Sequence, residues 1–107
     1  MLSLFTPLSE QPAEEIFETL AAGGAFRLER IVSTGQITPE GQWYDQPQEE
    51  WVALLSGAAR LLIEGGQEQE MRPGDLLQIP AHCRHRVTWT DPQQETVWLA
   101  IHYEPKR

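Results

Sequence analysis

One stretch, Pro73 to Val87, constrains the fold of this chain more than any other. It opens with Pro73-Gly74-Asp75, which is typical of a tight turn because proline presets its own φ and glycine accepts a positive φ. Leu76 to Ile79 is a short apolar run that Pro80 ends, so it predicts a β-strand. A second strand is expected to begin at His85. A turn, a strand, a proline bend and a histidine at the next strand's entry would aim an imidazole into a β-barrel.

Short strands also fit most of the remaining sequence. Apolar and polar residues alternate from Phe26 to Ser33, as they do in a half-buried strand. Strands of this kind at intervals of roughly 8–12 residues are typical of a β-sandwich or β-barrel. Further strands are expected over residues 50–56, 60–64, 67–72, 76–79, 85–90 and 96–103.

One helix is expected, over residues 9–22. Pro12 suits the first helical turn, where its missing N–H costs nothing, and Gly23-Gly24 would end the helix. The apolar residues of its buried face, at i, i+3, i+4 spacing, would be Ile16, Phe17, Leu20 and Ala21. The predicted fold is therefore all-β with one N-terminal helix.

Length and charge limit what the chain can be. A chain of 107 residues makes one domain, here a helical segment over 1–24 and a β-barrel over 25–104. Sixteen acidic against eight basic side chains give a formal charge of −8, which argues against nucleic acid or an anionic membrane as a partner. The single cysteine, Cys83, cannot form an intrachain disulfide, and the first residues do not resemble a signal peptide. We expect a soluble cytoplasmic protein.

The run from Gly74 to Trp89 resembles motif 2 of the cupin superfamily, which is written G-x5-P-x-G-x2-H-x3-N. Gly74, Pro80 and His85 match in position. His82 stands in place of the family's second glycine, and Trp89 in place of its asparagine. The resemblance implies a cupin-type β-barrel, a double-stranded β-helix of two antiparallel sheets, over residues 25–104.

Upstream, Gly41 to Gly57 resembles motif 1, G-x5-H-x-H-x3,4-E-x6-G. Glu50 and Gly57 match the end of that motif, whereas its two histidines are absent. Counted back from Glu50, their places hold Trp43 and Asp45 with one spacing, or Tyr44 and Gln46 with the other.

In cupins the residues matching Glu50 and His85 are metal ligands, so the resemblance implies the same role here. Independently, Glu50 shares a strand face with apolar residues, which is costly unless the carboxylate is paired, protonated or metal-bound. Asp45, His82 or His102 would complete the set. These donors suit manganese, zinc or nickel; iron is less expected, because the family's three-histidine, one-glutamate set is missing.

The positions of His82 and His102 depend on register. On a regular strand His82 and His85 would point apart, and a bend between Pro80 and Cys83 would bring both inward. If a hairpin across Asp91-Pro92 pairs the last two strands, His102 lies diagonal to His85, and a one-residue slip places it outside.

Aromatic and basic residues are candidate ligand contacts. Trp43 and Tyr44, near the expected mouth, would stack on a ring. Arg30 interrupts an apolar face and would either bind an anion or, as we favour, pair with an acidic residue. Trp51 and Trp98 on outward strand faces predict a homodimer through sheet packing.

Three functions remain open from the sequence. The first is a cupin that holds a divalent metal and a small polar metabolite. The second is a metal-free cupin that binds a sugar or acid, with His85 as general base and Tyr44 or Tyr103 as acid, as in barrel sugar epimerases. The third is a non-catalytic sensor. The sequence names neither a substrate nor a reaction.

Overall fold

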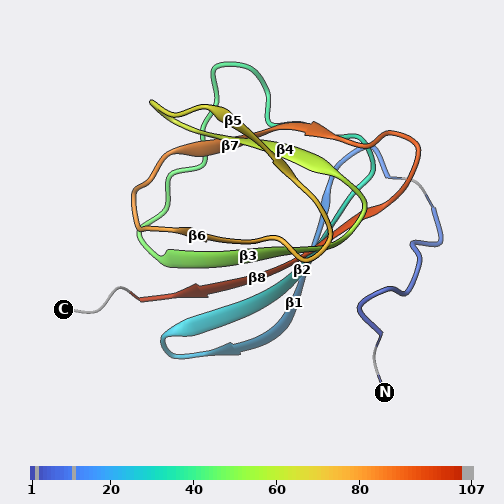
Figure 1. Cartoon of the computed structure of the whole chain (residues 1–107). Helices are drawn as coiled ribbons and strands as arrows, with labels where there is room; N and C mark the ends of the chain where they lie inside the picture. Colours follow the sequence, from blue (N-terminus) through green and yellow to red (C-terminus); the bar gives the residue numbers. More distant parts are fainter. Residues whose placement is uncertain (2, 11, 105–107) are drawn as a thin grey trace.

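The computed structural model describes residues 1, 3–10 and 12–104, and eight β-strands are found there. Every strand pair is antiparallel, and the strands form two sheets that face each other (Figure 1). The larger sheet has the order β1-β2-β8-β3-β6, and the smaller has the order β5-β4-β7. The strands are β1 (Ile16–Gly23), β2 (Phe26–Ser33), β3 (Glu49–Ser56), β4 (Ala59–Ile63), β5 (Glu68–Met71), β6 (Leu76–Ile79), β7 (His85–Thr90) and β8 (Thr96–Tyr103). The predicted all-β fold of two antiparallel sheets is confirmed.

The predicted N-terminal helix is wrong. Residues 16–23 form β1, which pairs with β2 across a hairpin that turns at Gly24 and Ala25. The register shifts between Thr19 and Ala21, so a β-bulge at Leu20 breaks the alternation of the strand. The apolar residues of the expected helical face therefore do not share a face of β1, since Phe17 pairs with Ile31 on the inner side and Ile16 pairs with Val32 on the outer side. Along the described ranges no helix is long and apolar enough to cross a membrane.

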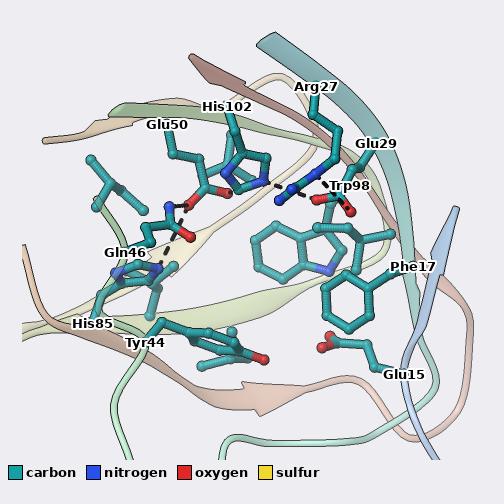
Figure 2. Close-up of a pocket in the computed structure, with 15 residues that line it drawn as sticks. Glu15, Phe17, Arg27, Glu29, Tyr44, Gln46, Glu50, His85, Trp98 and His102 are labelled. Atoms are coloured by element: carbon teal, nitrogen blue, oxygen red, sulfur yellow. Dashed lines mark hydrogen bonds and ion pairs between the residues drawn. The ribbon is translucent and has the colours of Figure 1, made fainter. Parts of the chain in front are cut away.

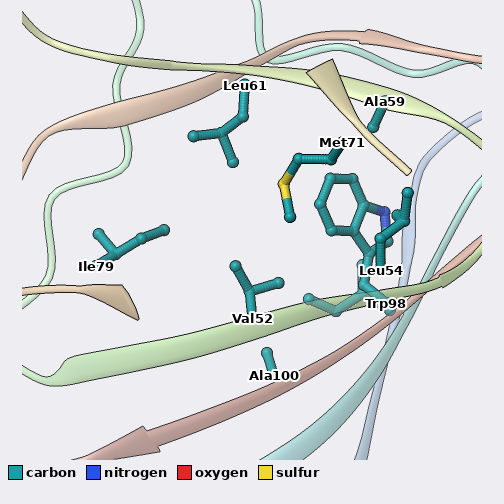
Figure 3. Packing of buried hydrophobic residues seen from close by; sticks show 9 residues of the cluster. Val52, Leu54, Ala59, Leu61, Met71, Ile79, Trp98 and Ala100 are labelled. Atoms are coloured by element: carbon teal, nitrogen blue, oxygen red, sulfur yellow. The ribbon is translucent and has the colours of Figure 1, made fainter. Parts of the chain in front are cut away.

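The core lies between the sheets, because every second side chain of a strand faces the same way. Leu54 of β3 pairs with Trp98 of β8, which pairs with Ile31 of β2, so the three lie side by side across the larger sheet. All three are buried. Leu61 and Met71, from β4 and β5 of the smaller sheet, are buried in the same cluster (Figure 3).

The expected hairpin between the last two strands is also wrong. β7 pairs with β4 in the smaller sheet, whereas β8 lies between β2 and β3 in the larger one. The residues from Asp91 to Glu95 therefore cross from one sheet to the other. Ahead of β3, Tyr44 forms an isolated bridge with His85, which places the segment before β3 alongside β7.

Candidate functional site

A cavity of about 200 Å³ lies between the two sheets. Phe17 and Tyr44, which are 50% and 39% exposed, lie where the cavity meets solvent. Figure 2 shows its ionisable and aromatic side chains turned toward one another. The cavity is lined by Glu15, Phe17, Arg27, Glu29, Ile31, Tyr44, Gln46, Glu50, Val52, Leu61, Ile79, His85, Val87, Trp98 and His102.

Strand register brings Glu50, His102 and Arg27 into one row. Glu50 of β3 pairs with His102 of β8, and His102 pairs with Arg27 of β2. Paired residues of antiparallel strands point to the same face of the sheet. This row of polar residues follows the apolar rows of the core along the sheet and supplies charged groups to the cavity.

A bend in the chain aims His85 inward. Three residues before it, His82 has a φ of 60°, a left-handed backbone conformation that is uncommon outside glycine. His85 then exchanges two backbone hydrogen bonds with Tyr44, and the two rings stack with centroids 5.5 Å apart. Nδ1 of His85 donates to the Cys83 carbonyl at 2.9 Å. Because that bond uses the Nδ1 proton, the lone pair of Nε2 is left to face the cavity.

Glu50 is the centre of the polar cluster and is only 6% exposed. The Gln46 side-chain amide donates to its Oε1 at 2.8 Å. Nε2 of His85 lies 3.7 Å from Oε1, and Nε2 of His102 lies 3.8 Å from Oε2. A buried carboxylate thus has one hydrogen bond and two nearby imidazoles, which are able to carry a positive charge when protonated.

Glu29 forms a second carboxylate centre with two partners. Nε2 of His102 donates to Glu29 Oε1 at 2.9 Å, and Nε of Arg27 lies 3.4 Å from Oε2. The other ring nitrogen of His102, Nδ1, is buried, and none of the described residues gives it a hydrogen-bond partner. The negative charge of Glu29 is therefore offset by the positive charge of Arg27, whereas Glu50 has a hydrogen bond from the neutral Gln46 amide instead.

Glu15 reaches the cavity from the segment just before β1. The Ser33 hydroxyl donates to its carboxylate, and Ser33 Oγ accepts the Trp98 indole N–H at 3.0 Å. Burial raises the pKa of Glu15, and the hydrogen bond from Ser33 partly opposes this shift. Burial also raises the pKa of Tyr44, and the charges of Glu15 and Glu50 raise it further. Three carboxyl groups, Glu15, Glu29 and Glu50, thus line the cavity.

Four of the predicted site residues line this cavity, and four do not. Glu50, His85, His102 and Tyr44 line it. His102 does so through its β3 neighbour Glu50 rather than through the expected hairpin. The residues found elsewhere are Asp45, His82, Trp43 and Arg30.

The four outlying residues have partners of their own. The exposed side chain of His82 bonds to Asp45 Oδ1 at 3.0 Å. Trp43 lies under the guanidinium groups of Arg84 and Arg86, on the outside of the smaller sheet. Arg30 points away from the cavity, where it donates to the Thr6 carbonyl and lies 3.6 Å from Glu18. The acidic partner that the sequence favoured for Arg30 is thus present.

Sequence reasoning missed several residues of the site, and a signal existed for some of them. Gln46 occupies a motif-1 histidine position under the second of the two spacings, and both residues of that spacing, Tyr44 and Gln46, line the cavity. Arg27 and Glu29 alternate with Ile31 on one face of β2, but alternation alone does not say which face points inward. Nothing in the sequence indicated that Glu15 lines the cavity, because its segment was expected to be helical.

Comparison with known proteins identifies the family. A family model for the Cupin domain matches residues 31–102, which is more than half of the chain. The chain belongs to the cupin family. No curated protein matches it.

Solved structures agree with this assignment. A candidate mannose-6-phosphate isomerase from Ralstonia eutropha JMP134 is 47% identical, with a TM-score of 0.94 and coverage of 98% of both chains. A cupin superfamily protein from Desulfitobacterium hafniense DCB-2 is 16% identical, with a TM-score of 0.75 over 92% of this chain and 84% of that one. An RmlC-like cupin from Methanocaldococcus jannaschii, described as a double-stranded β-helix, is 12% identical, with a TM-score of 0.71 over 97% and 93%. The last two similarities show the fold alone.

The cavity contains side chains of the types that bind divalent metals, but they are not arranged as ligands of one ion. Glu50 and His85 are ligand types for zinc, manganese or nickel, and the Cys83 carbonyl holds His85 in the tautomer that a metal needs. Nε2 of His102, however, is bonded to Glu29. Among the residues with a described placement, no three His, Cys, Asp or Glu side chains gather closely enough to hold an ion. As they stand, these residues do not fit a metal centre.

Proposed function

We propose that this cupin binds a small polar metabolite in the cavity and moves a proton on it, as in isomerisation or epimerisation, without a metal ion. One observation carries the proposal: a buried carboxylate, Glu50, lies within 3.8 Å of two imidazoles in a cavity that reaches solvent. Ionisable groups that converge in a partly apolar cavity are the usual equipment of acid–base catalysis.

His85 is the proposed general base. The Cys83 carbonyl holds its Nδ1 proton, so Nε2 is free to accept a proton from a ligand in the cavity. Glu50, 3.7 Å from that nitrogen, would stabilise the imidazolium that forms.

Tyr44 is the proposed general acid. It lines the cavity and stacks on His85, so its phenol lies beside the proposed base. Tyr103, the other acid considered from the sequence, lies on the outer face of the larger sheet, where its hydroxyl accepts the Trp51 indole N–H at 3.1 Å. That placement favours Tyr44 of the two.

The 47% identical Ralstonia protein supports the reaction class, since its name is that of an isomerase. It does not support a phosphorylated substrate here, because the three carboxylates of the cavity would repel a phosphate.

The test is deuterium exchange from heavy water into mannose, mannosamine and mannose 6-phosphate, followed by NMR at the carbon next to the carbonyl. We expect exchange above background with at least one sugar, reduced about 100-fold or more in His85→Ala and Glu50→Gln. His82→Ala is the matched control, since His82 is exposed and outside the cavity. Equal exchange in all variants would refute the assignment, and binding without exchange would leave the non-catalytic sensor.

A divalent metal is the second candidate, and one observation favours it: the free Nε2 of His85 beside Glu50. Glu50 and His85 would hold the ion, and His102 would join them only after its Nε2 had left Glu29. Elemental analysis of protein purified without an affinity tag separates the two functions. Stoichiometric zinc, manganese or nickel that is lost in Glu50→Gln would replace the metal-free proposal.

We also propose that the chain forms a homodimer through the outer face of the larger sheet. Trp98 does not contribute, because it is buried in the core, contrary to the prediction that it faces outward. Trp51 does face outward, and its neighbours across β8 and β6 add apolar area. The outward apolar residues are Phe26, Leu28, Trp51, Ala53, Leu76, Leu99 and Ile101.

A further inference from the structure

Carboxylates outnumber basic side chains around the cavity. Glu15, Glu29 and Glu50 line it, and Arg27 is the one arginine or lysine among the described lining residues. Arg27 pairs with Glu29, which also receives a hydrogen bond from His102. In the described part of the chain, neither Glu15 nor Glu50 makes an ion pair with an arginine or lysine.

Glu15 is held in place without being neutralised. Its partner is the Ser33 hydroxyl, which the Trp98 indole N–H holds from the other side. Ser33 and Trp98 are both buried, so this chain of hydrogen bonds is rigid and fixes the carboxylate at the cavity wall. Burying a carboxylate without a cation is costly, and a cationic ligand would remove that cost.

Aromatic rings lie beside the same carboxylate. Figure 2 shows the Phe17 ring between Glu15 and Trp98, and the Tyr44 hydroxyl end directed toward Glu15. Phe17 is half exposed at the mouth of the cavity, where its face is available to a ligand. Aromatic faces attract cations, so rings that line the cavity beside a carboxylate suit an ammonium group.

We propose that Glu15, Phe17, Tyr44 and Trp98 form a subsite for a small organic cation, so that the ligand carries an ammonium group at this end and its reacting part beside Glu50 and His85. The inference rests on the proposed function only in taking the cavity as the ligand site. It assigns a different end of that cavity, with residues that take no part in proton transfer apart from Tyr44.

The test compares matched ligands that differ in charge. Isothermal titration calorimetry would use two series: mannosamine, mannose and mannose 6-phosphate, then benzylamine, benzyl alcohol and benzoate. In at least one series we expect the amine to bind about tenfold more tightly than its neutral partner, and the anion to bind most weakly. The amine's advantage should shrink as salt is added, because screening weakens charge pairing.

Variants locate the effect. Glu15→Gln keeps an acceptor for Ser33 and should remove most of the amine's advantage while leaving the neutral partner's affinity unchanged. Phe17→Leu should reduce that advantage in part, through loss of the ring face. Glu14→Gln, at the exposed neighbouring position, is the control and should change nothing.

Three results would overturn the subsite: a neutral or anionic ligand binding most tightly in both series, no amine binding at all, or an unchanged amine advantage in Glu15→Gln. The proposed function fails separately, through deuterium exchange that does not depend on His85 and Glu50. A neutral sugar that exchanges, with neutral ligands binding at least as tightly as their amines in both series, would refute the cation subsite and retain the proton-transfer site.

Discussion

At the scale of single residues, the cavity depends on carboxylates placed where burial penalises their charge. Glu15 is the clearest case, since burial raises its pKa above the usual 4.5. The folded protein then holds a proton that the unfolded chain has already released. Stability linked to Glu15 is fully present below pH 4.5 and is lost as the pH rises through the folded-state pKa.

Glu15→Gln removes this titration. We therefore predict that the free energy of unfolding of the variant rises relative to the wild type as the pH increases from about 4 to 7. Urea unfolding at several pH values measures the difference, with Glu14→Gln as the exposed control. A difference that stays constant with pH, or that falls, would mean that Glu15 is not buried as described.

Residue patterns predicted part of this site for physical reasons. Glu50 was found because it matches a cupin motif and because a carboxylate on an apolar strand face needs compensation, and His85 because it matches a cupin motif and follows a proline bend. Glu29 was not found, because its role depends on which face of β2 points inward. His102 was left undecided, because the structure places it through pairing with β3, far away in sequence.

At the scale of elements, local signals predicted the strands better than their partners. The turn at Pro73-Gly74 lies where the sequence indicated, and so do β6, which precedes His85, and β7, which begins at His85. β1 was missed because its apolar residues, although at helical spacing in the sequence, lie on both faces of the strand and at the bulge of Leu20. The pairing of β8 with β2 and β3 was missed because strand order within a sheet depends on long-range packing, which the turn at Asp91-Pro92 does not reveal.

The outer face of the larger sheet carries a prediction of its own. Leu76 on β6 is 61% exposed and adjoins outward residues of β3, so an apolar face of this extent should be covered by a second chain. Sedimentation velocity at micromolar concentration should give twice the chain mass of 12.2 kDa. Leu76→Glu should give the monomer mass, and Ile37→Glu, an exposed apolar position outside the strands, should not. A monomeric wild type would contradict the dimer.

At the scale of the whole molecule, two sheets enclose an apolar core and a cavity that the core residues and a group of charged side chains line together. The three histidines of the chain report on this cavity, since His85 and His102 line it and His82 lies outside it. They therefore provide a test in which the chain supplies its own control.

The most direct test of the central claim, that the cavity beside Glu50 and His85 is the binding site, is an NMR titration of the histidine rings with mannose and with mannosamine. We predict that the ring signals of His85 and His102 shift together and saturate with at least one of these ligands, while the signals of His82 stay in place. A shift confined to His82, or no shift at any histidine with either ligand, would contradict the account.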